Sequence, residues 1–300
     1  MIKKVWAMLR QISSISQRLN ELEVSIHLMR ESLGRIENRQ IKSSDAVASL
    51  EDAEFRTFSQ WGDDGIIQHL VREINPSSST FVEFGVENYK ESNTRFLLVN
   101  NNWKGLVIDG SEKHVESIKQ QPIYWQRNLK AVREFVTVEN INSILINNGI
   151  TGEIGLLSVD IDGNDYWVWK AIDCIQPAIV ICEYNHRFGP TRAVTIPYDA
   201  NCVRSKAHYS TLYYGSSLRA LNILAESKGY VLVGCNSAGN NAFFVRNDLK
   251  PMNVSSVSVE ASFVEGQYRE SRYPDGRLAY LSQESEMEIL SGLPVVEVKP

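Results

Sequence analysis

The strongest constraint on this chain is a regular alternation of short apolar runs with amphipathic stretches between residues 80 and 246. The apolar runs are rich in Val, Ile and Phe, as buried strands are, and the stretches between them carry the period of helices. The predicted strands lie in TFVEFGV, GLVIDGS, REFVTV, IGLLSVDI, AIVICEY, YVLVGCN and NAFFVRND. Strands that alternate with helices in this way predict a doubly wound α/β fold.

The last two predicted strands depart from this alternation, because only the short Gly/Asn turn SAGNN separates them. A turn this short joins antiparallel neighbours, whereas a parallel pair needs a long crossover connection. The sequence therefore predicts a seven-stranded α/β sheet with one antiparallel strand near an edge.

A heptad array precedes the sheet region. Residues 1–43 carry apolar side chains in unbroken steps of three and four, the spacing of a left-handed coiled coil. The array consists of Val5, Met8, Ile12, Ile15, Leu19, Leu22, Ile26, Met29, Leu33 and Ile36. Arg18 and Glu23 flank the stripe and can pair across a parallel interface, so we expect self-association through residues 1–43. The alternative is an amphipathic helix that packs on its own domain.

The remaining organisation follows from composition. Residues 44–54 form a polar linker, 55–250 the α/β domain, and 251–300 a polar extension with a small hairpin around Pro274 to Gly276. The net charge of −5 and the lack of a basic stripe argue against nucleic acid as a partner. The four cysteines lack CxxC spacing, which favours free thiols in a reducing cytoplasm. The sequence contains no run of about 18 apolar residues, so it predicts no membrane span.

Polar side chains gather where the predicted parallel strands end. In a doubly wound sheet, ligands bind beyond the carboxyl ends of the strands. The residues at these five ends are Glu83 and Gly85, Asp109, Glu139 and Asn140, Asp160 and Asp162, and Glu183 and Asn185. They are the first candidates for a binding site.

The first two strand ends indicate the kind of ligand. Asp109 follows the Gly85 turn by the distance at which an acidic side chain holds a nucleotide ribose, although it could also cap the next helix. A dinucleotide site needs three glycines in the first turn, but here Gly85 stands alone beside Glu87 and Glu91. A pyrophosphate would be repelled there, whereas the cationic S-adenosylmethionine would be attracted.

Five stretches resemble the motifs of class I S-adenosylmethionine-dependent methyltransferases: FSQWGDDGIIQHL, FVEFGVENYKESNT, WKGLVIDG, FVTVENIN and LLSVDIDGNDYWVWKAI. More narrowly, they resemble the FkbM-like set found among bacterial capsule and O-antigen genes. The resemblance covers about residues 55–248 and implies a Rossmann-like methyltransferase domain. It also implies O-methylation of a sugar or sugar-linked group of a surface polysaccharide, with a glycan or nucleotide-sugar as acceptor. The family's first loop usually carries a second glycine where this chain has Glu87-Asn88-Tyr89.

The resemblance also implies roles for the first strand ends. Glu83 and Gly85 line the methionine end of the cofactor, and Asp109 holds its ribose. From the residue types alone, Ser92, Asn93 and Thr94 are expected to cap the helix that follows the first strand.

Two further parts of the cofactor site follow from the same resemblance. Glu139 or Asn140 meets the adenine. Gln60 and Asp64 belong to a stretch that resembles a lid over the amino-acid end of the cofactor.

The fourth and fifth strand ends predict a metal site. Asp160 and Asp162 alternate along one strand, as Glu183 and Asn185 do along its neighbour, so each pair points one way. Oxygen ligands of this kind suit Mg²⁺ or Mn²⁺, which could hold an acceptor hydroxyl. The alternative is that Asp160 binds the acceptor or loop amides directly, while Asn164 or Asp165 caps the next helix.

The candidates for a general base are His186 and His208, and Asp160 is a further catalytic candidate that acts through the metal ion or by a hydrogen bond to the acceptor. Arg187, Arg192 and Arg204 lie in the same irregular insert as the histidines and would suit an anionic acceptor. Two other functions remain open from the sequence. One is an NAD-dependent sugar oxidoreductase or epimerase, and the other is a non-catalytic coiled-coil scaffold with a degenerate cofactor site.

Overall fold

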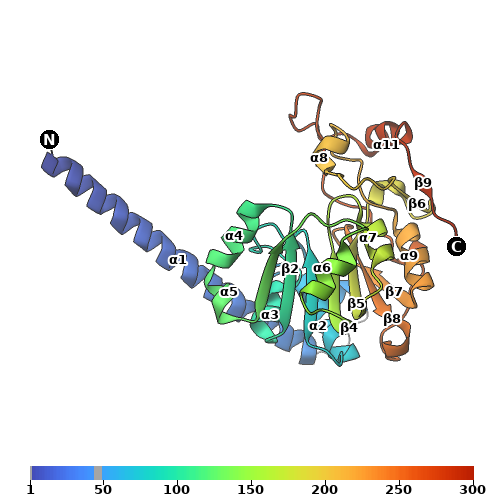
Figure 1. Ribbon diagram of the computed structural model, residues 1–300, viewed down its shortest axis with the longest axis horizontal. Helices are drawn as coiled ribbons and strands as arrows, with labels where there is room; N and C mark the ends of the chain where they lie inside the picture. The colour runs from blue at the N-terminus through green and yellow to red at the C-terminus, as the bar shows by residue number, and fades with distance from the viewer. Residues whose placement is uncertain (1, 44–48) are drawn as a thin grey trace.

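A seven-stranded sheet forms the centre of the protein (Figure 1), for which a computed structural model describes residues 2–43 and 49–300. The strand order is β3-β2-β1-β4-β5-β8-β7, and β8 runs antiparallel to both β5 and β7. The strands are β1 Thr80–Phe84, β2 Lys104–Asp109, β3 Leu129–Arg133, β4 Gly152–Val159, β5 Ile175–Glu183, β7 Tyr230–Cys235 and β8 Asn241–Arg246. The predicted doubly wound α/β sheet with one antiparallel strand is confirmed.

Helices cover both faces of this sheet. The helices are α2 Asp63–Ile74, α3 Arg95–Asn100, α4 Glu112–Gln120, α5 Pro122–Gln126, α6 Ile141–Asn147, α7 Asp165–Ala171 and α9 Leu218–Ser227. Successive strand residues face opposite layers: Phe81 packs with α2, α3 and α4, whereas Val82 packs with α6, α7 and α9. Both faces are therefore buried, which explains the continuous apolar runs.

The N-terminal segment is a single long helix, α1 Ile2–Ser43, that extends well beyond the body of the molecule (Figure 1). Its second half packs on the domain, where Gly34 is buried against Thr57 and Phe96. The apolar stripe from Ile12 to Ile36 stays exposed. The side chains of Val5 and Met8, which the heptad array includes, lie outside the described residues, as do linker residues 44–48.

The C-terminal extension is packed against the domain. It contains α10 Val259–Ser262, α11 Gln283–Ser291 and β9 Val296–Glu297, and β9 pairs with β6 Val194–Thr195 in the insert after β5. The insert also holds the short helix α8 Arg204–Ala207. A bridge between Arg272 and Leu278 forms the expected small hairpin. None of the helices within the described residues combines the length and apolar character that crossing a membrane requires.

Candidate functional site

Three carboxylates meet where β4 and β5 end. Asp160 and Asp162 follow β4, and Glu183 is the last residue of β5. Val159 pairs with Cys182 across the two parallel strands, so the residues just beyond them converge. Oxygen atoms of the three side chains all lie within 4.8 Å of one another. We call Asp160, Asp162 and Glu183 the carboxylate trio.

The trio is electrostatically strained. Burial and the nearby Asp162 and Asp165 raise the pKa of Asp160 well above its ordinary value. Burial and the carboxylates of Asp160 and Asp162 do the same to the pKa of Glu183. Glu183 is 8% exposed, and its Oε2 is buried without a hydrogen-bond partner. A buried carboxylate oxygen without a partner is costly, so this arrangement favours a bound proton or a cation.

Arg204 supplies the positive charge that faces the trio. Its Nη1 donates to Asp162 Oδ1 at 2.7 Å, its Nε donates to the Thr211 carbonyl at 2.9 Å, and its guanidinium lies 3.8 Å from the Tyr214 ring centroid. One guanidinium against three carboxylates leaves an excess of negative charge. The all-oxygen donor set fits Mg²⁺ or Mn²⁺.

Asn185 does not join this group. Its Nδ2 donates to the carbonyls of Leu212 and Tyr214, at 2.9 and 3.1 Å, and its Oδ1 accepts from the Arg187 amide. β5 ends at Glu183, so the strand alternation that related Glu183 to Asn185 does not continue. We therefore leave Asn185 out of the candidate metal ligands.

Asp165 fixes the loop that carries the first two carboxylates. Its side chain accepts from the amides of Ile161 and Gly163 at 2.8 and 2.9 Å. Asn164 precedes α7 without a side-chain cap and instead donates to the Asp199 carbonyl. The predicted side-chain cap of α7 is therefore absent, and Asp165, the first residue of α7, holds the preceding loop instead.

Neither candidate histidine reaches the trio. His186 is 5% exposed and packs edge-on against Tyr268, and both of its ring nitrogens lack partners. Burial, together with the neighbouring Arg187, lowers the pKa of His186 to about 3, so it is neutral. His208 is held by Ser210 Oγ, 2.7 Å from Nδ1. Neither histidine belongs to the group of ligand atoms that Asp160, Asp162 and Glu183 form.

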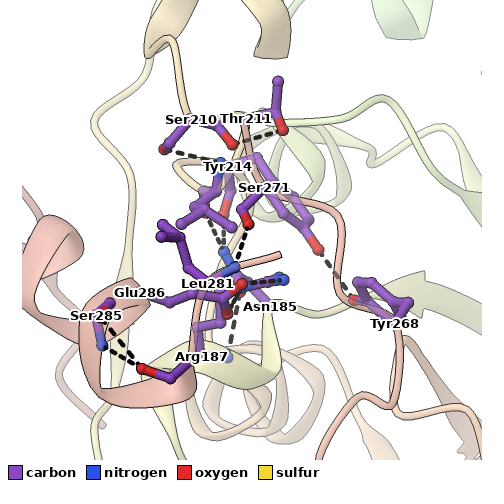
Figure 2. A network of polar contacts seen from close by, with 12 residues as sticks. Asn185, Arg187, Ser210, Thr211, Tyr214, Tyr268, Ser271, Leu281, Ser285 and Glu286 are labelled. Carbon is purple, nitrogen blue, oxygen red and sulfur yellow. Dashed lines mark hydrogen bonds and ion pairs between the residues drawn. The ribbon is translucent and has the colours of Figure 1, made fainter. Parts of the chain in front are cut away.

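The C-terminal extension closes this side of the site through polar contacts. Figure 2 shows Arg187 and Glu286 paired, with Nε 2.6 Å from Oε2 and both side chains almost fully buried. In the same network the hydroxyls of Tyr214 and Tyr268 lie 3.1 Å apart. Arg187 is therefore engaged within the protein and not free to bind an anionic acceptor.

Glu83 secures the turn after β1. Its carboxylate accepts from Ser92 Oγ, the Asn93 amide, and both the amide and the hydroxyl of Thr94. Thr94 precedes α3, but its side chain makes no capping hydrogen bond to that helix. Ser92, Asn93 and Thr94 donate to Glu83 instead. Glu83, rather than the three residues, supplies the acceptor at the start of α3.

The turn after Glu83 is conformationally unusual. Gly85 has φ +68°, and a Cβ there would overlap the Asp160 carbonyl oxygen. Glu87 and Tyr89 also have positive φ, at 46° and 60°. Non-glycine residues pay about 1–2 kcal/mol for this conformation. The strained positions coincide with the segment where the resembled family usually has a second glycine.

Asp109 lies against this turn. Its Oδ2 accepts from the Glu87 amide at 2.9 Å, and its Oδ1 accepts from the Ser111 amide at 2.8 Å and lies 3.1 Å from His114 Nδ1. Ser111, not Asp109, caps α4. Asp109 thus connects the ends of β1 and β2, which is where a ribose-binding acid is expected.

In the lid stretch, Asp64 and Gln60 have different surroundings. Asp64 is buried, and its Oδ2 accepts from the amides of Thr57, Phe58 and Ser59 at 2.6–2.8 Å. Gln60 is exposed on the loop that these bonds shape. Asp64 therefore positions the loop and is not itself available to a ligand.

Phe135, just beyond the end of β3, is a candidate site residue that the sequence pattern did not single out. Asn140 closes its own turn by bonding the Thr137 amide and the Phe135 carbonyl, and the exposed Glu139 accepts from the Tyr198 hydroxyl. Phe135 is 46% exposed and lies against Gly110, where a Cβ would be 3.2 Å from its ring. An exposed aromatic ring beside Asp109 is a suitable surface for a purine base.

A pocket of about 520 Å³ joins the two halves of the site. Its lining includes Phe135 from the β3 end, Asp162 from the trio and Arg204 from α8. Glu270 and Arg272 of the C-terminal extension complete one side. The pocket is large enough for part of a nucleoside or for a sugar ring.

Comparison with known proteins yields no matching family model and no match among curated proteins. Several solved structures share parts of the architecture. The N-terminal domain of EvdMO1 with SAH bound has a TM-score of 0.40 and 10% identity, over 70% of this chain and 94% of that one. An O-methyltransferase from Bacillus cereus in complex with SAH has a TM-score of 0.41 and 13% identity, over 72% and 89%. A putative caffeoyl-CoA O-methyltransferase from Staphylococcus aureus has a TM-score of 0.41 and 13% identity, over 73% and 99%.

Proposed function

We propose that this protein is an S-adenosylmethionine-dependent O-methyltransferase that acts on a sugar or sugar-linked group of a bacterial surface polysaccharide. The observation that carries the proposal is the contact between Gly85 and the Asp160 carbonyl. This contact places the turn after β1 next to the carboxylate trio. We propose that the turn binds the cofactor and that the trio binds the acceptor. Methyl transfer requires donor and acceptor side by side. The glycan acceptor rests on the resemblance to the FkbM-like set.

Residues on the cofactor side fit S-adenosylmethionine, which supplies an electrophilic sulfonium methyl. Asp109 would hold the ribose hydroxyls, and the ring of Phe135 would support the adenine. Gln60 is an exposed polar side chain on the lid loop. A turn with one glycine and an acidic Glu87 disfavours the pyrophosphate of NAD, which argues against an oxidoreductase.

Residues on the acceptor side would align a hydroxyl and remove its proton. When bound, S-adenosylmethionine would supply the methyl group that the acceptor oxygen takes up as the carbon–sulfur bond breaks, and Asp160 would accept the hydroxyl proton. Burial and the neighbouring carboxylates raise the pKa of Asp160, which makes its carboxylate a stronger proton acceptor than an exposed aspartate. The trio would also hold a divalent cation, which lowers the pKa of a bound hydroxyl.

The test is incubation of the purified protein with methyl-labelled S-adenosylmethionine and extracted bacterial surface glycans, with and without EDTA. We expect label in the glycan fraction, loss of transfer in Asp160→Asn, and no loss in the control Asp173→Asn, whose side chain is exposed. Transfer that survives EDTA would assign Asp160 as a base without a cation.

Calorimetric titration separates this proposal from the other two functions. We expect binding of S-adenosylmethionine and none of NAD. Binding of NAD alone would favour the oxidoreductase, and binding of neither would favour the non-catalytic scaffold.

A further inference from the structure

Helix α1 presents two different faces. One face packs on the body of the protein, through side chains three or four residues apart: His27, Arg30, Gly34, Asn38 and Ile41. The other face carries the apolar stripe. The two faces use different residues, so the packing of α1 on its own domain leaves the stripe available.

The stripe is uncovered along its described length. Its exposed fractions run from 48% to 60% in Ile12, Ile15, Leu19, Leu22, Ile26, Met29, Leu33 and Ile36. Every described side chain between residues 11 and 26 is exposed, and this part of the helix projects from the body (Figure 1). An unsupported helix of this length is marginally stable in water. A row of large apolar side chains on it marks an interaction surface.

We propose that a second copy of this chain covers the stripe, with the two α1 helices parallel in a left-handed coiled coil. Ile12, Leu19, Ile26 and Leu33 are spaced by seven, and Ile15, Leu22, Met29 and Ile36 form the second series three residues further on. This 3.5-residue period keeps one face of each helix turned toward an identical partner.

Charge supports the parallel arrangement. Arg18 and Glu23 occupy the flanking positions that face each other between parallel helices in register. Glu23 also lies 3.3 Å from Lys90 within the chain, but both side chains are more than 60% exposed. An exposed pair of that kind contributes little and can exchange partners.

The packed face connects this association to the proposed cofactor loops. The ring of His27 lies 5.1 Å from that of Phe58, and Arg30 donates to the Thr57 carbonyl. Arg95 bridges His27 and the turn after β1, with 3.3 Å to His27 Nε2 and 2.5 Å to the Tyr89 carbonyl. Pairing of α1 therefore supports the lid loop and the strained turn. Only the cofactor role of these loops rests on the proposed function.

Two matched double variants test the association. Leu19→Glu with Leu22→Glu places charge on the stripe, at side chains 60% and 59% exposed. Val24→Glu with Leu28→Glu makes the same kind of change off the stripe, at side chains 59% and 56% exposed. Light scattering at micromolar concentration should give a multiple of 34.0 kDa for wild type and the control, and 34.0 kDa for the stripe variant.

A wild-type protein that scatters as a single chain would overturn the proposal, because the partner would then be another molecule. Equal masses for all three proteins would also overturn it. Ile12→Cys tests the orientation: parallel helices in register should form a disulfide-linked dimer under mild oxidation that the wild type does not form. A dimer that resists this cross-link contradicts the parallel arrangement.

Amide hydrogen exchange tests the connection to the loops without any ligand. Residues 57–60 and 85–89 should exchange several-fold faster in the stripe variant than in the control. Identical exchange in the two variants would overturn the connection. Since no S-adenosylmethionine is used, failure of the proposed function would not affect this result.

Discussion

Asp63 provides a sharp test of how buried charge limits the stability of this fold. It is the first residue of α2 and is fully buried, where its carboxylate accepts from the side-chain amides of Asn236 and Asn241 at 2.9 and 3.2 Å. Burial raises its pKa from 3.8 to about 7, although the two amide hydrogen bonds act in the opposite direction. The perturbation we consider is Asp63→Asn, which keeps an acceptor oxygen and removes the charge.

The direction of the pH dependence of stability follows from the number of protons bound in the native and the unfolded state. Between about pH 4 and pH 7 the native Asp63 holds a proton that the unfolded chain has lost, so stability falls as pH rises through this range. At about 1.4 kcal/mol per pH unit, the shift to about 7 corresponds to a loss of roughly 4 kcal/mol by pH 8. The side-chain amide of the variant does not titrate, so the variant has no such loss. Its free energy of unfolding should therefore rise relative to wild type by about 4 kcal/mol between pH 4 and 8.

Scanning calorimetry at pH 4, 5, 6, 7 and 8 measures this difference. For a chain of this size, about 4 kcal/mol corresponds to a relative gain in melting temperature of roughly 8 °C. The exposed Asp173→Asn is the control and should track the wild type at every pH. A melting-temperature difference between Asp63→Asn and wild type that stays constant from pH 5 to 8 would refute the reasoning.

Three further outcomes are expected. Asp109→Ala should weaken S-adenosylmethionine binding by more than tenfold in calorimetric titration, and an unchanged dissociation constant would contradict the ribose assignment. Mn²⁺ at about 100 times its dissociation constant should stabilise the protein by about 2.7 kcal/mol, seen as a higher melting temperature that Glu183→Gln abolishes. An equal rise in the variant would rule out Glu183 as a ligand. Glu286→Ala should lower the free energy of unfolding in urea by about 3–5 kcal/mol, because Arg187 is left buried without its partner. A loss below about 1 kcal/mol would mean that solvent reaches Arg187.

The fold could be predicted from the sequence because it is specified by patterns within short segments of the chain. Strands such as β4 lie in continuous apolar runs, and the SAGNN turn between β7 and β8 is too short for a crossover. The position of β8 between β5 and β7 is harder to predict, because strand order depends on contacts between strands that are far apart in the sequence. The packed face of α1 was likewise not predicted, because most of its contacts come from His27, Arg30 and Gly34 and not from a row of apolar side chains.

The candidate site could be predicted from the ends of the two paired strands, because Glu183 is the last residue of β5 and Asp160 directly follows β4, while the turn that Asp165 holds brings Asp162 to them. Asp160, Asp162 and Glu183 lie at or just beyond two paired strands, and the structure brings them together. Asn185 and Phe135 lie two residues beyond the ends of β5 and β3, where the alternation of side chains stops. Asn185 therefore turns into the protein, while Phe135 is exposed despite its place in an apolar run.

Buried polar atoms without a hydrogen-bond partner are concentrated beside the two proposed elements of the site. Folding normally leaves buried polar groups paired, so exceptions need a cause. Among the described residues, the exceptions gather beside the two proposed elements: Thr57, Asp64 and Arg95 at the lid loop and turn, and Glu183, His186, Arg187 and Ser216 after β5. Arg72 is the exception that lies apart from both. Among the described residues, seven non-glycine residues have positive φ, and three of them, Glu87, Tyr89 and Asp162, lie in the same two elements. These features lie at the edge of the sheet where our proposed cofactor and acceptor elements meet, as the proposed function predicts.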